Sequence, residues 1–227
     1  MENKKEIIVF GVNSNESFAR IKLNDKWNFI NKEGKLLSEQ WFDNCGLFIT
    51  NQWFDWCDDF FDGFARVILN DKWNFINKEG KLLTNQWFHD CTHFKKNGLA
   101  KVTFNGKYNF INKDGKLLSE QWFDLCDDFK GGFAWVVLNN KENYINQDGN
   151  LLSEQWFDDC SNFHDGFAKV ELNNKYNFIN QDGKLLSNQW FDDCWFDDCY
   201  IFRGGFAWGE LNGKVYKIDY NGKLHKI

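Results

Sequence analysis

Proline is absent from the 227 residues, although loops usually contain it. Together with abundant Asn, Lys, Ile and Phe, its absence suggests coding bias in an A+T-rich genome. The chain also lacks any apolar run near the roughly 18 residues needed to span a bilayer. The run at residues 7–10 is too short for the core of a signal peptide. We therefore expect a soluble, cytoplasmic protein with no membrane partner.

An excess of basic residues is missing too. The chain has 27 Lys and Arg against 33 Asp and Glu, a formal charge of −6, whereas nucleic-acid binding needs a basic patch. We therefore expect no nucleic-acid partner. Histidine is scarce, with only His89, His93, His164 and His225. Nucleophilic catalysis needs a base beside the nucleophile, and no histidine recurs beside the cysteines, so we expect no catalytic residue and no enzyme.

Seven cysteines are present, and each closes a Trp-Phe-x-x-Cys box. Cysteines that recur at one place in every repeat are typical of small buried apolar residues. A disulfide framework belongs to small secreted domains, so we expect no disulfide, although oxidation would allow Cys194 and Cys199 to pair. The seven positions are Cys45, Cys57, Cys91, Cys126, Cys160, Cys194 and Cys199.

One pattern is repeated about six times along the chain. Its Phe-Ala (once Leu-Ala) strand starts at Phe18, Phe64, Leu99, Phe133, Phe167 and Phe206, and the three middle intervals are 35, 34 and 34 residues. A fixed period of this length marks a repeat array, in which each unit must stack on its neighbours. We predict one array over 1–227: an N-terminal cap at 1–16 that adds a strand, about six repeats at 17–210, and a charged C-terminal cap at 211–227.

The repeat at residues 166–199 predicts the local structure. Residues 167–172 and 175–180 alternate with a period of two, which indicates strands. Asn173-Asn174 lies between them, and such a pair tolerates the positive φ of a two-residue hairpin turn. After the Asp-Gly turn at 182–183, residues 184–190 are expected to form a third strand. The spacing of Trp156, Cys160 and Phe163 allows one helical turn in the connector.

The fold class predicted from these elements is all-β. Tandem three-stranded antiparallel meanders carry aromatic residues on both faces, so a single exposed sheet would be marginal. We expect them to stack into an elongated, superhelical β-solenoid. A β-propeller is the alternative, although its blades usually run about 40–45 residues.

The block at residues 25–35, Asp-Lys-Trp-Asn-Phe-Ile-Asn-Lys-Glu-Gly-Lys, follows the strand Phe-Ala-Arg-Ile at 18–21. Taken six times over about residues 17–225, this pattern resembles the WG (KWG) repeat family, whose members are often presumed to mediate interactions. Asn stands in place of the name-giving Gly, and Lys217 is assigned to that position in the last copy. The proline-free variant also looks like repeat proteins of large DNA viruses, for which the location would be the host cytoplasm. The Asn positions are Asn28, Asn74, Asn109, Asn143 and Asn177.

One position varies where the rest of the strand is constant, two residues after the first aromatic or leucine. Stacked repeats would align these residues in a stripe of cations and tryptophans, where repeat proteins usually place recognition. Solvated lysines and tryptophans covering apolar surface are an equally good interpretation. The candidate binding stripe is Arg20, Arg66, Lys101, Trp135, Lys169 and Trp208.

Other clusters receive structural interpretations. The two histidines and the cysteine at residues 89–93 are the only local group with metal-ligand chemistry, and they occur in one repeat only. Paired aspartates at 158–159, 192–193 and 197–198 lack the alternation and glycine of a calcium loop and fit turns better. We therefore expect no metal and no cofactor. The predicted function is a non-enzymatic scaffold for a protein partner. The alternatives are carbohydrate binding through exposed aromatics and, less favoured, a carboxylate-dependent hydrolase.

Overall fold

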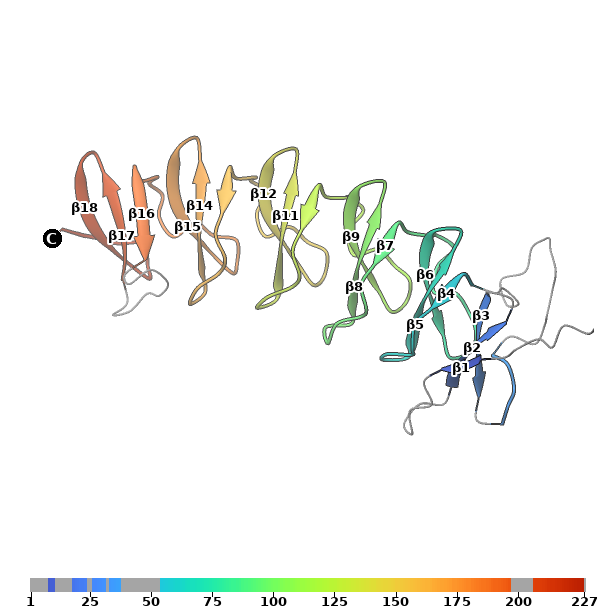
Figure 1. Ribbon diagram of the computed structural model, residues 1–227. Coiled ribbons are helices and arrows are strands. Elements are labelled where there is room, and N and C mark those ends of the chain that lie inside the picture. The colour runs from blue at the N-terminus through green and yellow to red at the C-terminus, as the bar shows by residue number, and fades with distance from the viewer. Residues whose placement is uncertain are drawn as a thin grey trace, which may run out of the picture. The chain divides into compact units, whose positions relative to one another are not determined.

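The computed structural model describes residues 8–10, 18–23, 26–31, 33–37, 54–196 and 206–226, and every regular element among them is a β-strand. The all-β expectation is confirmed. Contacts divide the chain into two units, Met1–Glu120 and Gln121–Ile227, each with three antiparallel sheets (Figure 1). No helix in the described ranges is long and apolar enough to cross a membrane.

In the first unit, the sheets have the strand orders β1-β2-β3, β4-β5-β6 and β7-β8-β9. Two six-residue strands form the hairpin of each sheet, and a strand of two or three residues lies at its edge. The strands are β1 (Ile8–Phe10), β2 (Phe18–Leu23), β3 (Lys26–Asn31), β4 (Trp56–Cys57), β5 (Phe64–Leu69), β6 (Lys72–Asn77), β7 (Asp90–Cys91), β8 (Leu99–Phe104) and β9 (Lys107–Asn112).

The second unit repeats this plan and adds a fourth strand to its last sheet, in the orders β10-β11-β12, β13-β14-β15 and β16-β17-β18-β19. The strands are β10 (Leu125–Cys126), β11 (Phe133–Leu138), β12 (Lys141–Asn146), β13 (Asp159–Cys160), β14 (Phe167–Leu172), β15 (Lys175–Asn180), β16 (Asp193–Phe196), β17 (Phe206–Leu211), β18 (Lys214–Asp219) and β19 (Leu224–Lys226).

The hairpins form for the reason that the sequence predicted. In β14–β15, Val170 pairs with Asn177 across a two-residue turn, and the turn residues Asn173 and Asn174 have φ angles of 53° and 57°. Asparagine adopts these left-handed angles more readily than most side chains. The predicted N-terminal strand is also present, because β1 pairs with β2 through Val9 and Ile21.

The predicted third strand at residues 184–190 was wrong. Leu185 makes only an isolated bridge with Ile179. The third strand of a sheet is instead a short segment of the Cys box that precedes the hairpin, such as β13 beside β14 or β16 beside β17. The box at residues 190–194 serves two hairpins: Phe191 exchanges backbone hydrogen bonds with Tyr176 of the hairpin before it, while β16 pairs with β17 of the hairpin after it. The predicted helical turn at residues 156–163 was also wrong, since Cys160 lies in the extended β13.

A buried asparagine explains why residues 184–190 do not continue as a strand. The Nδ2 of Asn177 donates to the carbonyls of Ser187 (2.8 Å) and Gln189 (3.1 Å), and its Oδ1 accepts from the Phe178 N–H (2.8 Å). These bonds hold the loop out of the ladder between the two points where it touches β15, at Leu186 and Phe191. The last repeat has no such Asn. The register places Tyr216 at that position, so the assignment of Lys217 was wrong by one residue.

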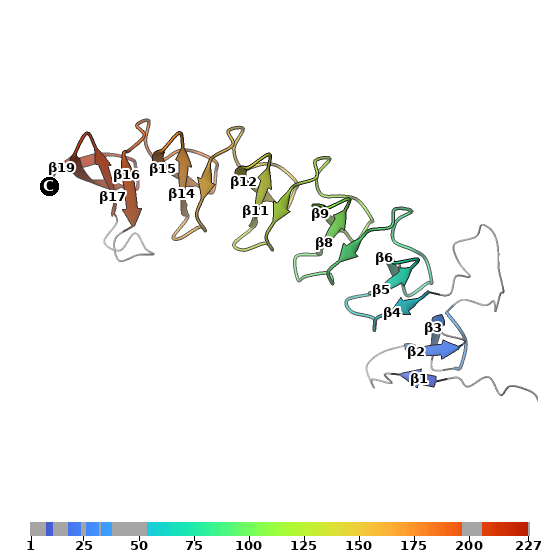
Figure 2. The same cartoon turned by 45° about the horizontal axis from the view of Figure 1, so that its top comes forward.

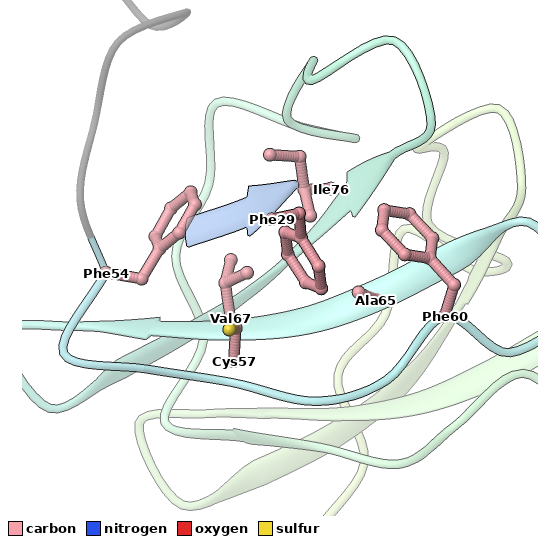
Figure 3. Packing of buried hydrophobic residues seen from close by; sticks show 7 residues of the cluster. All are labelled: Phe29, Phe54, Cys57, Phe60, Ala65, Val67 and Ile76. Carbon is pink, nitrogen blue, oxygen red and sulfur yellow. The ribbon is translucent and has the colours of Figure 1, made fainter. Parts of the chain in front are cut away.

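The core lies between consecutive sheets. In the first unit, Phe29 of β3 packs against Cys57, Ala65 and Val67 of the next sheet, together with Phe54, Phe60 and Ile76 (Figure 3). In the second unit, Tyr144 packs against Ala168, Val170 and Ile179. The Ala-Val face of one sheet therefore covers the aromatic face of the sheet before it. The hairpins β11–β12 and β14–β15 accordingly lie side by side in both ribbon views (Figures 1 and 2).

A glycine turn allows this close stacking. Gly183 has a φ of 78°, and a Cβ placed on it would overlap the carbonyl oxygen of Leu152 in the preceding repeat. The equivalent glycines Gly115 and Gly222 meet Leu83 and Leu186 in the same way. Both the left-handed backbone and the lack of a side chain are needed here.

Candidate binding surface

All six residues of the predicted stripe are half-buried on the middle strand of a sheet. Three belong to the first unit (Arg20, Arg66 and Lys101) and three to the second (Trp135, Lys169 and Trp208). On their strands they point to the aromatic face, which the next sheet covers in most repeats. Their contacts therefore decide whether they are exposed for recognition or used between repeats.

The two arginines bind the edge strand of the following repeat. The Nη1 of Arg20 donates to the Cys57 carbonyl (3.0 Å), and its Nε lies 2.7 Å from Asp59. The Nη1 of Arg66 donates to the Cys91 carbonyl, also at 3.0 Å. An edge strand has backbone groups without a ladder partner, and each guanidinium satisfies one of them.

Arg66 is also held within its own repeat. Its Nη2 donates to Asp58 (2.7 Å), and its guanidinium lies 5.1 Å from the centroid of the Trp73 ring, within the range of a cation–π contact. Arg20 stands over Trp27 in the same way, at 5.7 Å. In both repeats, the aromatic ring at the second residue of the returning strand therefore packs against the guanidinium of the stripe residue.

In the second unit, the same links use other chemistry. Lys169 lies 4.2 Å from the Tyr176 ring centroid and 3.3 Å from Asp193 of the next repeat. In the preceding repeat, Trp135 stands at the position equivalent to Lys169, and Glu142 stands at the position equivalent to Tyr176. The ring N–H of Trp135 donates to Glu142 Oε2 (2.8 Å).

Glu142 completes that junction, because the same oxygen accepts the backbone N–H of Cys160 in the next repeat (2.8 Å). Burial raises the pKa of the Glu142 carboxyl, although its hydrogen bonds from Trp135 and Cys160 oppose the shift. Glu142 was not predicted from the sequence. A signal was available, since the second residue of the returning strand is aromatic in the other repeats except the last, where it is Val215.

The remaining stripe residues differ from these. The backbone N–H of Lys101 donates to Thr92 Oγ1 (2.9 Å). The Trp208 ring lies under Lys217, whose Nζ is 5.2 Å from the ring centroid. The stripe is therefore mainly a set of links between consecutive repeats, and its role in recognition stays a prediction.

The recurring aspartates cap hairpins. The Oδ2 of Asp158 accepts the Asn173 N–H (2.7 Å), and that of Asp192 accepts the Asn212 N–H (2.6 Å). An ion pair with Lys141 and this backbone bond lower the pKa of the Asp158 carboxyl. His89 takes the same place in its repeat, where its Nδ1 accepts the Asn105 N–H (3.2 Å). The pair at 197–198 lies outside the described residues.

The cluster at residues 89–93 is divided among different partners. The Nε2 of His93 lies 2.9 Å from Asp58, His89 caps a turn, and Cys91 is buried. Within the described ranges, no three His, Cys, Asp or Glu side chains form a group that could hold a metal ion. Burial raises the pKa of the Cys57, Cys91 and Cys194 thiols to about 12, so none is a thiolate at neutral pH.

The comparison with family models identifies these units. A model described as a WG containing repeat matches residues 54–73, 75–108, 110–141 and 144–176, more than half of the chain. The chain belongs to the WG containing repeat family. The matched stretches run from Phe54, just before β4, to Tyr176, the second residue of β15. No curated protein shows significant sequence similarity to this WG repeat chain.

Several solved structures share a general likeness with the WG repeat chain at low identity. Hsv2 of Kluyveromyces lactis is 9% identical, with 95% of this chain and 75% of that chain covered and a TM-score of 0.33. A protein of unknown function from Bacteroides caccae is 12% identical, with coverages of 97% and 92% and a TM-score of 0.27. PorZ of Porphyromonas gingivalis is 9% identical, with coverages of 92% and 31% and a TM-score of 0.33.

Proposed function

We propose that this WG repeat protein is a non-enzymatic scaffold that binds protein partners. The proposal rests on the observation that the recurring polar residues make structural contacts within and between repeats. The repeated asparagines, aspartates and cysteines hold the repeat together, as for Asn177, Asp158 and Cys194. Their chemistry is thus committed to the frame, which supports a binding role over a catalytic one.

The residues that differ between repeats supply the candidate contact surface. The first residue of the edge strands from β4 to β16 is tryptophan, leucine or aspartate, and Leu125 is 49% exposed. Varied residues on a constant frame are how repeat proteins usually recognise partners. We call these residues the edge row: Trp56, Asp90, Leu125, Asp159 and Asp193.

Photo-cross-linking in the native cellular background tests the proposal. A photoreactive amino acid is placed at Asp90 or Asp159 of the edge row, and in matched control chains at the hairpin tips Asn105 or Asn140, which are also exposed. We expect one protein to be cross-linked from the edge row and not from the tips. Equal labelling at the edge row and the tips would refute a specific contact there.

Carbohydrate binding is the second candidate, because one aromatic pair supports it. The rings of Trp56 and Trp73 meet edge-on with their centroids 5.5 Å apart, and both side chains are half-buried. An aromatic face that remains accessible offers apolar area with a defined geometry. A glycan array separates the candidates: binding that is lost in Trp56→Ala supports sugars, whereas an empty array leaves the protein partner as the proposal.

For the arrangement of the repeats we propose an open solenoid. Within each unit, the Ala-Val face of one sheet packs on the aromatic face of the sheet before it. Repeats that stack in this way can continue in a row without the last sheet packing on the first. A compact chain of 227 residues has a radius of gyration of about 17 Å. Small-angle scattering should give a clearly larger value, and a value near that of a compact chain would favour a closed propeller. The buried thiols fit the proposed cytoplasmic location.

A further inference from the structure

The part of the edge row that lies in the second unit is exposed on three consecutive sheets. Leu125, Asp159 and Asp193 each begin the short edge strand of their sheet, β10, β13 and β16. Leu125 is 49% exposed, and both aspartates are exposed as well. In both ribbon views these edge strands lie on the same side of their hairpins (Figures 1 and 2). Since stacked sheets lie about 10 Å apart, the row offers one apolar and two acidic contacts at intervals of about 10 Å.

The negative charge in the middle of this row is not neutralised by the chain itself. Glu171 stands directly across from Asp159 on the same face of the sheet, and like charges directly opposite each other are destabilising. Lys169 of the same sheet lies 3.3 Å from Asp193 of the next one instead. Within the described ranges, no ion pair includes Asp159. Its carboxylate is therefore available to a cation from another molecule.

The edge strands in this row do not favour a partner that adds a further β-strand. The N–H of Cys160 donates to Glu142 Oε2 (2.8 Å), and that of Cys194 donates to Asp193 Oδ1 (2.7 Å). Strand addition needs free backbone groups at a sheet edge, and these two donors are already bonded. We therefore expect a partner that is recognised through its side chains.

The spacing of the row selects the shape of that partner. A polyproline II helix has three residues per turn and rises about 3.1 Å per residue. Every third side chain therefore faces the same side at intervals of about 9.3 Å, close to the separation of stacked sheets. In a β-strand, by contrast, residues three apart point to opposite sides. A polyproline II helix also has no internal hydrogen bonds to satisfy from the edge.

We propose that the edge row of the second unit binds a proline-rich segment that carries one apolar and two basic residues at three-residue intervals. The apolar side chain packs on Leu125, and the basic side chains pair with Asp159 and Asp193. This inference rests on the protein-binding function proposed above and names the chemistry of the partner. Exposed ion pairs contribute little, so we expect a dissociation constant on the order of hundreds of micromolar.

Fluorescence anisotropy of labelled, capped peptides added to the full chain tests the proposal. The probes are Leu-Pro-Pro-Arg-Pro-Pro-Arg and its reversed sequence, because such a helix can lie along the row in either direction. At least one should bind more tightly than Leu-Pro-Arg-Pro-Pro-Pro-Arg, which has the same composition and charge but a different spacing.

Three variants locate the contact. Asp159→Lys should weaken binding about fivefold or more, because attraction becomes repulsion. Leu125→Ser should weaken it about threefold without changing the charge. The control Asp148→Lys makes the same charge change at an exposed glycine turn of the second unit and should leave binding intact. Asp159→Lys also removes the repulsion from Glu171, so a lower stability should not account for its weaker binding.

Three results would overturn the inference. Neither peptide could bind, the peptide with altered spacing could bind equally well, or Asp159→Lys could bind like the wild type. A protein cross-linked from Asp159 in the experiment above, together with an absence of peptide binding, would remove this inference and leave the scaffold function standing.

Discussion

The buried asparagine of the returning strand offers a sharp test of how the repeat is held together. We consider Asn177→Asp, which replaces the side-chain NH₂ with oxygen and leaves the shape unchanged. Asn177 is fully buried, and its Nδ2 makes both hydrogen bonds to the loop, at Ser187 and Gln189. In the variant, an acceptor faces two carbonyl acceptors, and the buried Ser187 carbonyl and the part-buried Gln189 carbonyl lose their donor.

The expected cost is large at neutral pH. The unsatisfied Ser187 carbonyl costs about 1–3 kcal/mol, and the partly solvated Gln189 carbonyl adds about 1 kcal/mol, so the free energy of unfolding falls by about 2–4 kcal/mol. Burial and the two carbonyls raise the pKa of the new carboxyl in the folded state. The folded variant therefore binds a proton more readily than the unfolded chain, so its deficit is smallest in acid and grows as the pH rises through the folded pKa.

Asn180→Asp is the matched control. Asn180 uses only its Oδ1, which accepts the N–H groups of Asp182 (3.0 Å) and Lys184 (2.9 Å), and a carboxylate keeps both bonds. The chain itself has Asp219 at this position in the last repeat, where it accepts from Asn221 and Lys223. Urea unfolding followed by tryptophan fluorescence compares the two variants. Equal midpoints would refute the account of Asn177 as the donor that holds the loop.

Three further predictions concern stacking, protonation and thiols. Gly183→Ala should cost about 2–4 kcal/mol in urea unfolding, through strain and overlap with the preceding repeat, whereas Gly213→Asn, in an open turn at a φ of 70°, should be nearly neutral. Because the pKa of Glu142 is raised, its contribution to stability is present in acid and lost as the pH rises. The midpoint temperature of thermal unfolding of Glu142→Gln should therefore be higher than that of the wild type at neutral pH and equal to it in acid. Cys57 and Cys194 should resist alkylation in the native protein, as mass spectrometry of peptides would report; rapid labelling of either would contradict their burial.

Much of the fold followed from the sequence because local chemistry repeats. The period of two in residues 167–180 and the Asn173-Asn174 turn each had one good structural interpretation, and other copies along the chain agreed with both. The Cys box was harder to interpret. Its Phe191 pairs backward and its Asp193 pairs forward, and a period counted along the chain does not show which hairpin a strand joins.

The candidate site was predicted less well, for a related reason. The stripe was found because its residues vary, but variation alone does not separate a residue that faces solvent from one that links two repeats. Arg66 reaches the carbonyl of Cys91, 25 residues away, and no local pattern marks that carbonyl as unpaired. The exchange of Trp135 and Glu142 becomes meaningful only once the register places them on one face.

The double pairing of the Cys box at residues 190–194 bears on how such a protein changes length. Because this short stretch is tied to the hairpin before it and the hairpin after it, removing or copying a whole period keeps that double pairing intact. A deletion that is not a whole period would leave a Cys box without a matching hairpin on one side. Gains and losses in this lineage should therefore come in whole multiples of the period, apart from additions within the linking stretches.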